Sequence, residues 1–138
     1  TKSNDMHLES QNQKELYHHI GKLFYAIAAS DKQVSEEEIA QMKAIISAEL
    51  LVQDEIGVDA DCQIENAFDW CVEEGADYKR CFDEFKEFKQ EHGKLFSPNV
   101  IKMIVHTSNA IAAAVSNHNK TEHSMLTEIK KMLHQTEN

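Results

Sequence analysis

Residues 13–30 read QKELYHHIGKLFYAIAAS, and this stretch decides the fold class. Its apolar side chains recur at the three- and four-residue spacing of one helical face: Leu16, Ile20, Leu23, Phe24 and Ile27. No segment of the chain shows a sustained alternation of apolar and polar residues, and the sequence holds only four Gly and one Pro for hairpin turns. The sequence therefore predicts an all-α protein.

Capping and turn residues divide the remainder of the chain into further helices. Ser35, with Glu38 three residues later, forms a capping box. Gly75 is expected to end the third helix, and Ser97 followed by Pro98 to begin the fifth. The six helices are expected at about residues 13–30, 35–50, 61–74, 78–93, 98–116 and 121–133, with 51–60 as a loop and 1–12 as a flexible polar tail.

The chain also resembles itself when it is shifted by 84 residues. Without gaps, Ala26-Ile27-Ala28-Ala29 falls on Ala110-Ile111-Ala112-Ala113. Similar amphipathic stripes can match by chance, which is the alternative to a true duplication. We expect a compact bundle of about six to seven helices, in a single domain over residues 13–138, with an internal duplication of a helical hairpin.

Residues 23–39, LFYAIAASDKQVSEEEI, resemble the first hairpin of TerB-like domains. That hairpin has an Ala-rich helix, then Asp-Gly, then a Ser, and a Glu three positions after the Ser. TerB-like domains are all-helical and internally duplicated, and the family is associated with tellurite resistance and related stress systems. The resemblance implies a non-enzymatic, stress-associated binding or adaptor module.

The resemblance further implies a divalent cation held by acidic residues at the two hairpin turns. Asp31 and Glu38 match the Asp and Glu of the first turn, and Glu122 matches the Glu of the second. Lys32 replaces the family's Gly, and Val115 occupies the position of the second Asp. Capping of the second helix is the alternative role of Glu38.

The identity of such a cation depends on which side chains join the site. Carboxylate oxygens suit Ca²⁺ or Mg²⁺. His118 and His123 flank Glu122 in sequence, and imidazole ligands would suit Zn²⁺.

The formal net charge of −10 is confined to one quarter of the chain. Ten acidic residues and no Lys or Arg lie between Lys43 and Lys79, while acidic and basic residues balance elsewhere. This charge disfavours nucleic acids and anionic membranes as partners.

Four of these acidic residues recur every fourth position along the third helix: Asp61, Glu65, Asp69 and Glu73. Like charges at this spacing repel one another, and no basic residue of that helix relieves them. A metal-independent scaffold that docks a basic protein partner on these residues is therefore the second function hypothesis. A solvated face is the alternative interpretation.

Other classes of function find no support in the sequence. We expect no enzyme, because no nucleophile–base pair or nucleotide-binding glycine pattern is recognisable. Cys62, Cys71 and Cys81 contain no C-x-x-C pair, and the latter two are expected to pack as small hydrophobes. Their odd number indicates a reducing compartment, the cytoplasm.

No apolar run approaches the roughly 20 residues of a membrane span, so we expect no membrane insertion. Trp70 falls off the apolar stripe of its helix and is expected in an exposed patch or a dimer contact. The sequence leaves homodimerisation open.

Overall fold

The computed structural model describes the backbone of residues 2–30, 36–52, 57–114 and 120–134, and side chains within 12–30, 36–48 apart from Glu38, 62–113 and 124–133. The described residues contain helices and no strand, which confirms the predicted all-α class. The helices are α1 (Lys2–Ala29), α2 (Glu36–Val52), α3 (Gly57–Glu74), α4 (Tyr78–Glu91), the short 3₁₀-helix η1 (Gly93–Leu95), α5 (Pro98–Ala114) and α6 (Lys120–His134).

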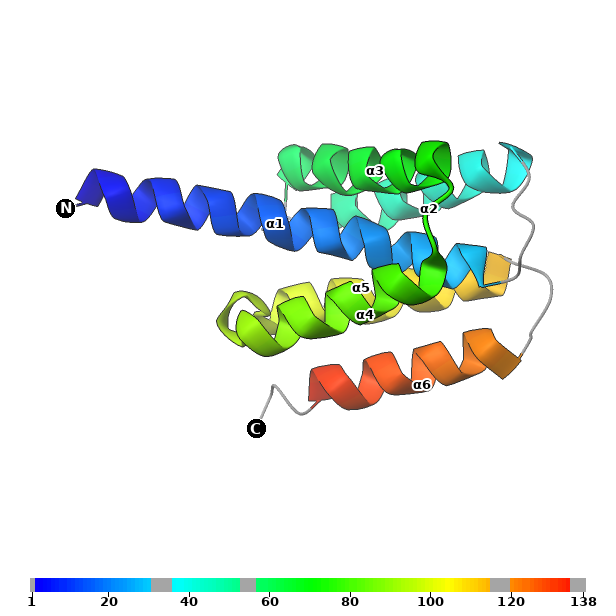
Figure 1. Ribbon diagram of the computed structural model, residues 1–138. Coiled ribbons are helices and arrows are strands. Elements are labelled where there is room, and N and C mark those ends of the chain that lie inside the picture. The colour runs from blue at the N-terminus through cyan, green and yellow to red at the C-terminus, as the bar shows by residue number, and fades with distance from the viewer. Residues whose placement is uncertain (1, 31–35, 53–56, 115–119, 135–138) are drawn as a thin grey trace.

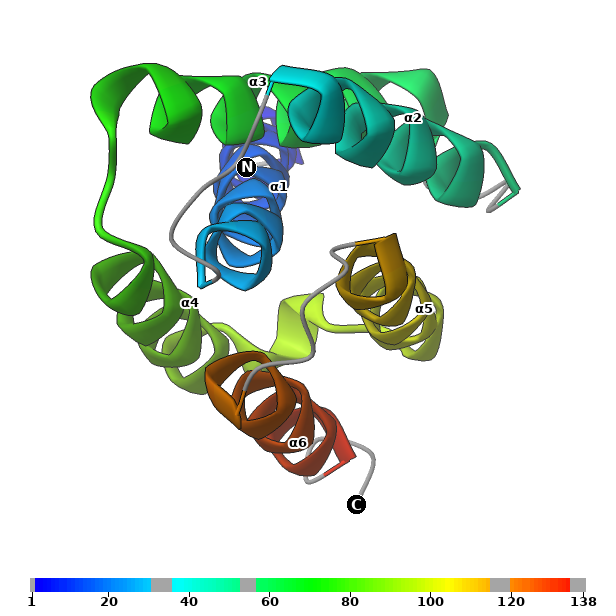
Figure 2. The same cartoon turned by 90° about the vertical axis from the view of Figure 1, so that its right-hand side faces the viewer.

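Helix α1 lies at the centre of the bundle. Figure 2 looks along it and shows α2 and α3 on one side and α4 and α5 on the other. Every side chain from Leu23 to Ala28 is buried, including Tyr25 and Ala26, which lie outside the predicted stripe. A helix segment that is apolar on all sides lies in the interior of a protein. The apolar stripe predicted from the sequence therefore includes only part of the α1 surface that is buried.

The other helices surround α1 in two groups (Figure 1). Helix α3 packs against α1 and α2, and α2 also contacts α5. Helix α6 covers α5 with Met125, Ile129 and Leu133, and an ion pair at 3.5 Å joins Glu128 of α6 to Lys86 of α4.

Gly21 allows the close approach of α1 to α3. A Cβ atom on this residue would lie 2.5 Å from the carbonyl oxygen of Ile64 and 2.6 Å from the Cβ of Ala67. Neither neighbour is the flexible end of a long side chain, so no larger residue fits without a shift of one helix.

Two of the predicted helix ends are confirmed. Gly75 adopts φ 60°, and the amides of Gly75 and Ala76 donate to the carbonyls of Val72 and Cys71, as in a Schellman C-cap. Ser97 Oγ accepts a hydrogen bond of 3.2 Å from the amide of Val100 and so caps α5.

Two helix starts were placed too late by the sequence interpretation. Helix α1 begins at Lys2, so the backbone of residues 2–12, predicted as a polar tail, is helical and projects beyond the other helices in Figure 1. Helix α3 begins at Gly57, the residue expected at the centre of a loop. In neither place does a proline interrupt the helix, and Gly is tolerated at a helix N-terminus.

The predicted duplication of a hairpin is not visible in the packing. Helix α1 lies mainly against α3 and α4, whereas α5 contacts α2, α1 and α6. The duplication therefore stays a prediction.

Candidate docking surface around Trp70

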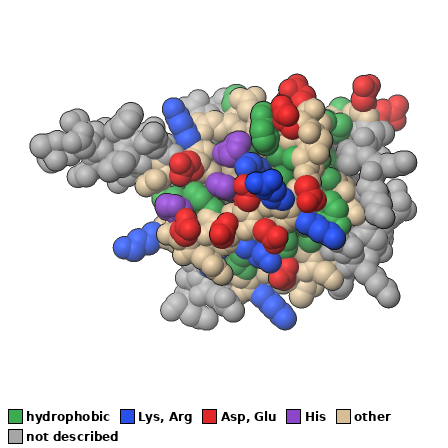
Figure 3. Space-filling view, in the orientation of Figure 1, with side chains coloured by type: hydrophobic (Ala, Val, Ile, Leu, Met, Phe, Trp, Pro, Cys, Tyr) green, Lys and Arg blue, Asp and Glu red, His purple; other side chains and the backbone are tan. Residues whose placement is uncertain are grey.

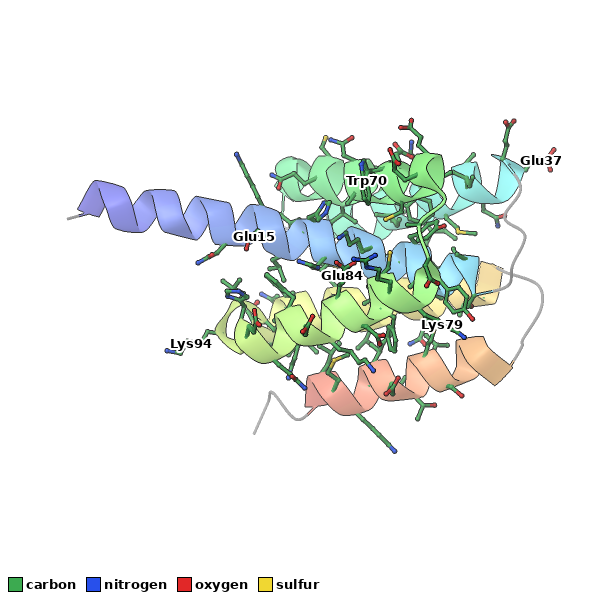
Figure 4. The ribbon with its side chains drawn as sticks, viewed as in Figure 1. Glu15, Glu37, Trp70, Lys79, Glu84 and Lys94 are labelled. Carbon is green, nitrogen blue, oxygen red and sulfur yellow. The ribbon has the colours of Figure 1, made fainter. Side chains whose placement is uncertain are left out.

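Trp70 is the one large hydrophobic side chain that is exposed among the described residues, at 48 % of its surface. It lies on α3, whose buried face carries Ile64, Phe68 and Cys71. Figure 4 shows the side chain above α1, on the side of the molecule that also presents Glu84 of α4. The prediction that Trp70 belongs to an exposed patch is consistent with this position.

Lys22 of α1 connects the three helices beneath this patch. Its Nζ lies 5.7 Å from the centroid of the Trp70 ring and 3.5 Å from Glu84 Oε1. The lysine side chain is only 11 % exposed. A cation over an aromatic face is attracted by the ring quadrupole, so Lys22 holds Trp70 in a defined orientation while Glu84 balances its charge.

Trp70 separates two open depressions. One, of about 370 Å³, is lined by residues of α1, α3 and α4 that include Lys22, Glu74, Arg80 and Cys81. The other, of about 390 Å³, lies between α1 and α3. A ridge formed by an aromatic side chain between two hollows can be gripped from both sides by a partner, and Trp and Arg are enriched among the residues that dominate binding energy.

The acidic residues of α3 have different surroundings. Asp69 forms an ion pair of 2.9 Å with Lys43 of α2, so a neighbouring helix relieves a charge that α3 itself does not. Glu65 is half-buried and interacts with a neighbouring group. The side chain of Asp61 lies outside the described residues.

Glu73 differs from the others, because it is exposed and forms no ion pair within the described part of the chain. The same holds for Glu74, which follows it in the last turn of α3. The C-terminal end of a helix carries a partial negative charge, so two adjacent carboxylates are unfavourable there. The predicted acidic stripe therefore divides into an inner part and an unbalanced end beside Trp70.

We refer to the residues around this end as the Trp70 face: Lys22, Trp70, Glu73, Glu74, Arg80 and Glu84. Figure 3 shows Lys, Arg, Asp and Glu side chains close to one another on this side of the molecule, with hydrophobic side chains scattered among them. Lys22 and Glu84 neutralise each other, which leaves Glu73 and Glu74 against Arg80.

A row of histidines borders the Trp70 face along α1 and α4. The His18 ring lies 6.3 Å from that of Trp70, and the His19 ring stacks on Phe88 at 4.4 Å. His92 lies on the same phenylalanine at 4.6 Å. Burial, with help from the charge of Lys22, lowers the pKa of His19 to about 4, and its buried Nδ1 has no hydrogen-bond partner.

These histidines belong to no described cluster of candidate metal ligands. In the part of the chain that the structure describes, no group of three or more His, Cys, Asp or Glu side chains converges as metal ligands would.

The residues predicted to hold a cation lie outside the described side chains. This applies to Asp31, Glu38 and Glu122, and also to His118, His123 and the Ser35 of the predicted capping box. The cation site accordingly stays a prediction from the resemblance.

A further depression, of about 560 Å³, lies at the same C-terminal end of α3, between Tyr25 of α1, Ile39 of α2 and the start of α4. Tyr25, which lines it, donates a hydrogen bond of 2.7 Å from its hydroxyl to the carbonyl oxygen of Ala76. Burial raises the pKa of this phenol. The walls of this depression are mostly apolar, with Ile39 and Val72 among them. The depression therefore offers packing surface without a convergent set of polar groups.

The sequence interpretation missed Lys22, Arg80 and Glu84. Lys22 is the one residue of these three with a recognisable signal, because it is the only charge between Ile20 and Ala29 in an otherwise apolar stretch. Arg80 and Glu84 look like ordinary surface residues of α4, and only the packing of α4 on α1 brings them to Trp70.

Comparison with known proteins gives no relative: no family model matches the chain, and no curated protein or solved structure is significantly similar to it. Among the helices as far as they are described, none combines the length and the apolar character needed to cross a bilayer.

Proposed function

We propose that this protein is a non-enzymatic docking module that binds a basic segment of a partner protein on the Trp70 face. The observation that carries the proposal is the exposure of Trp70 one helical turn before two carboxylates without ion-pair partners, Glu73 and Glu74. An apolar anchor beside unbalanced negative charge is complementary to a peptide that presents an apolar side chain next to Lys or Arg.

The charge of the whole chain supports the same kind of partner. The run of ten acidic residues between Lys43 and Lys79 attracts cationic segments at a distance. Because Asp69 is already paired with Lys43, we assign short-range recognition to the end of α3 rather than to all four predicted residues. The cytoplasmic location expected from the cysteines is part of this proposal.

Selection from a random peptide display library tests the proposed function. The wild-type protein serves as bait, and the Trp70→Ala variant, in which only an exposed side chain is removed, serves for counter-selection. We expect the enriched peptides to combine Lys or Arg with an apolar residue. Peptides that bind both proteins equally well, or a selection that enriches acidic sequences, would contradict the proposal.

The cation-binding, TerB-like function stays a separate hypothesis. It rests on the resemblance of residues 23–39 and on Asp31, Glu38 and Glu122, and no contact of the described side chains supports it. The docking proposal is independent of it, because the Trp70 face contains none of these three residues.

A further inference from the structure

We propose that the partner segment carries a second apolar anchor, which enters the depression beside Tyr25, and that basic residues separate this anchor from the one that contacts Trp70. The partner is then an apolar–basic–apolar segment that crosses the connection between α3 and α4. This inference rests on the docking function proposed above and specifies the chemistry of the partner.

Two depressions meet at the connection between α3 and α4. The depression of about 370 Å³ beside Trp70 and the depression of about 560 Å³ beside Tyr25 are both lined by Ala76 and Asp77. These two residues follow the end of α3 and lead directly into α4, as the connection drawn between the two helices in Figure 1 shows. A bound segment can therefore pass from one depression to the other by crossing this short connection.

The two depressions lie on different sides of α3. Successive residues of an α-helix are about 100° apart around its axis, so Trp70 and Val72 point about 200° apart. Trp70 lines the first depression and Val72 the second. Because a helix with its side chains is roughly 10–12 Å wide, the two anchor positions are about 10 Å apart, which about three residues of an extended segment can span.

The connection itself is held in place by hydrogen bonds. The hydroxyl of Tyr25 donates a hydrogen bond of 2.7 Å to the carbonyl oxygen of Ala76, and the amide of Ala76 donates one of 3.0 Å to the carbonyl oxygen of Cys71. Asp77 caps α4 by accepting a hydrogen bond of 3.2 Å from the amide of Lys79. A fixed connection presents the two depressions at a constant spacing, which reduces the entropy lost when a partner binds.

The charge near the connection favours basic residues between the two anchors. Glu73, Glu74 and Asp77 are exposed, and none of them forms an ion pair within the described residues. Arg80 lines the depression beside Trp70 and offsets part of this charge. The negative charge that remains is complementary to Lys or Arg side chains placed over the connection.

The depression beside Tyr25 suits an apolar side chain. Ile39, Val72 and Ala76 contribute aliphatic walls, and the hydroxyl of Tyr25 already donates its proton to Ala76. The depression therefore gains most from the burial of a side chain such as that of Leu or Phe. Full burial of one such side chain strengthens binding by roughly a factor of ten or more.

Three kinds of labelled lysine–leucine peptide test the second anchor on the wild-type protein. The one-anchor peptide has a single leucine followed by lysines, and the two-anchor peptides have a second leucine after two, three or four lysines. The control has the composition of a two-anchor peptide but its leucines are adjacent, so they cannot reach both depressions. By fluorescence anisotropy, we expect the best two-anchor peptide to bind about tenfold more tightly than the other two kinds.

The Ile39→Gln variant locates the second anchor. Ile39 lines the depression beside Tyr25 from α2 and is not part of the Trp70 face. This variant should bind the two-anchor peptide only as tightly as the one-anchor peptide, and the one-anchor peptide as tightly as the wild type does. Ile45→Gln is the matched control and should keep the tenfold difference, because Ile45 is also half-buried on α2 but lies outside the described lining of the depression.

The results distinguish the second anchor from the docking function. Binding of the one-anchor and two-anchor peptides with equal affinity would overturn the second anchor alone, as would an unchanged tenfold difference in folded Ile39→Gln. Equal affinity for the control with adjacent leucines would also overturn it, by showing unspecific apolar attraction. No binding of any peptide would overturn the docking function and the second anchor with it. The comparison of peptides uses the wild type, so it decides even if Ile39→Gln fails to fold.

Discussion

The ammonium of Lys22 on α1 lies 5.7 Å from the centre of the Trp70 ring on α3. The contact fixes an exposed aromatic side chain on a rigid base, since Lys22 is itself held by Glu84 of α4 at 3.5 Å. An exposed tryptophan that is held in one orientation loses less conformational entropy on binding than a free one. Three helices thus contribute to the proposed docking surface, and Trp70, the only tryptophan of the chain, reports on it by fluorescence.

Substitution of Gly21 tests the packing of α1 on α3. The Gly21→Ala variant is expected to lose about 1–3 kcal/mol of unfolding free energy, because its Cβ would overlap the backbone oxygen of Ile64. Gly93→Ala is the matched control, since a Cβ there meets nothing within 4 Å. Urea denaturation followed by circular dichroism measures both, and an equal effect of the two substitutions would refute the tight contact.

His19 makes stability depend on pH. Its folded pKa of about 4 lies below the value of about 6.5 in the unfolded chain, so the unfolded state binds the proton more readily. The native state is then fully favoured above pH 6.5 and loses up to about 3 kcal/mol as the pH falls toward 4.

The variant His19→Phe isolates this contribution from that of the carboxylates. It preserves an aromatic ring next to Phe88 and removes the titrating group. Thermal denaturation between pH 7 and 4 should show a smaller loss of stability for the variant than for the wild type, whereas parallel curves would rule out a depressed pKa at His19.

The first turn of α2 and the last turn of α3 allow a comparison of how carboxylates affect stability at opposite helix ends. Glu73 and Glu74 lie in the last turn of α3, and Glu36 and Glu37 in the first turn of α2, all four exposed. The helix dipole favours carboxylates at an N-terminus and disfavours them at a C-terminus by roughly 0.3–1 kcal/mol each.

The doubly substituted variant E73K/E74K should therefore be more stable than the wild type, and E36K/E37K less stable. Both carry the same change in net charge, so general repulsion cancels in the comparison. Equal shifts of melting temperature at low salt would show that these charges act through net charge alone.

The cation hypothesis from the sequence has its own test. Calorimetric titration with Ca²⁺, Mg²⁺ and Zn²⁺ is expected to give heat of binding that is lost in Asp31→Asn and Glu122→Gln variants, because carboxylate oxygens would be the ligands. Absence of heat or of a thermal shift at millimolar metal would remove this function.

Much of the fold could be predicted from local sequence patterns. Gly75 and the pair Ser97-Pro98 act through backbone geometry within one turn, so the helix ends they predicted are correct. The start of α1 was missed because a helical stripe is visible only where a helix is partly buried, and the turns from Lys2 onward project beyond the bundle.

The candidate site could be predicted only in part. Trp70 stands out in the sequence because it leaves the apolar stripe of its helix. The ion pair between Lys43 and Asp69 joins two different helices, and its formation depends on how those helices pack, which no local spacing encodes. For the same reason the acidic stripe was predicted as one unit, although Asp69 is paired with Lys43 and Glu65 interacts with another group of the protein.

Trp70 fluorescence gives the most direct test of the docking proposal. The probe is a synthetic amphipathic peptide with lysines on one helical face and leucines on the other. A control peptide has glutamate in place of every lysine. The lysine peptide should change the emission of the wild type and of E36K/E37K saturably, and that of E73K/E74K weakly or not at all. The same response from both variants, or from both peptides, would contradict recognition by the end of α3.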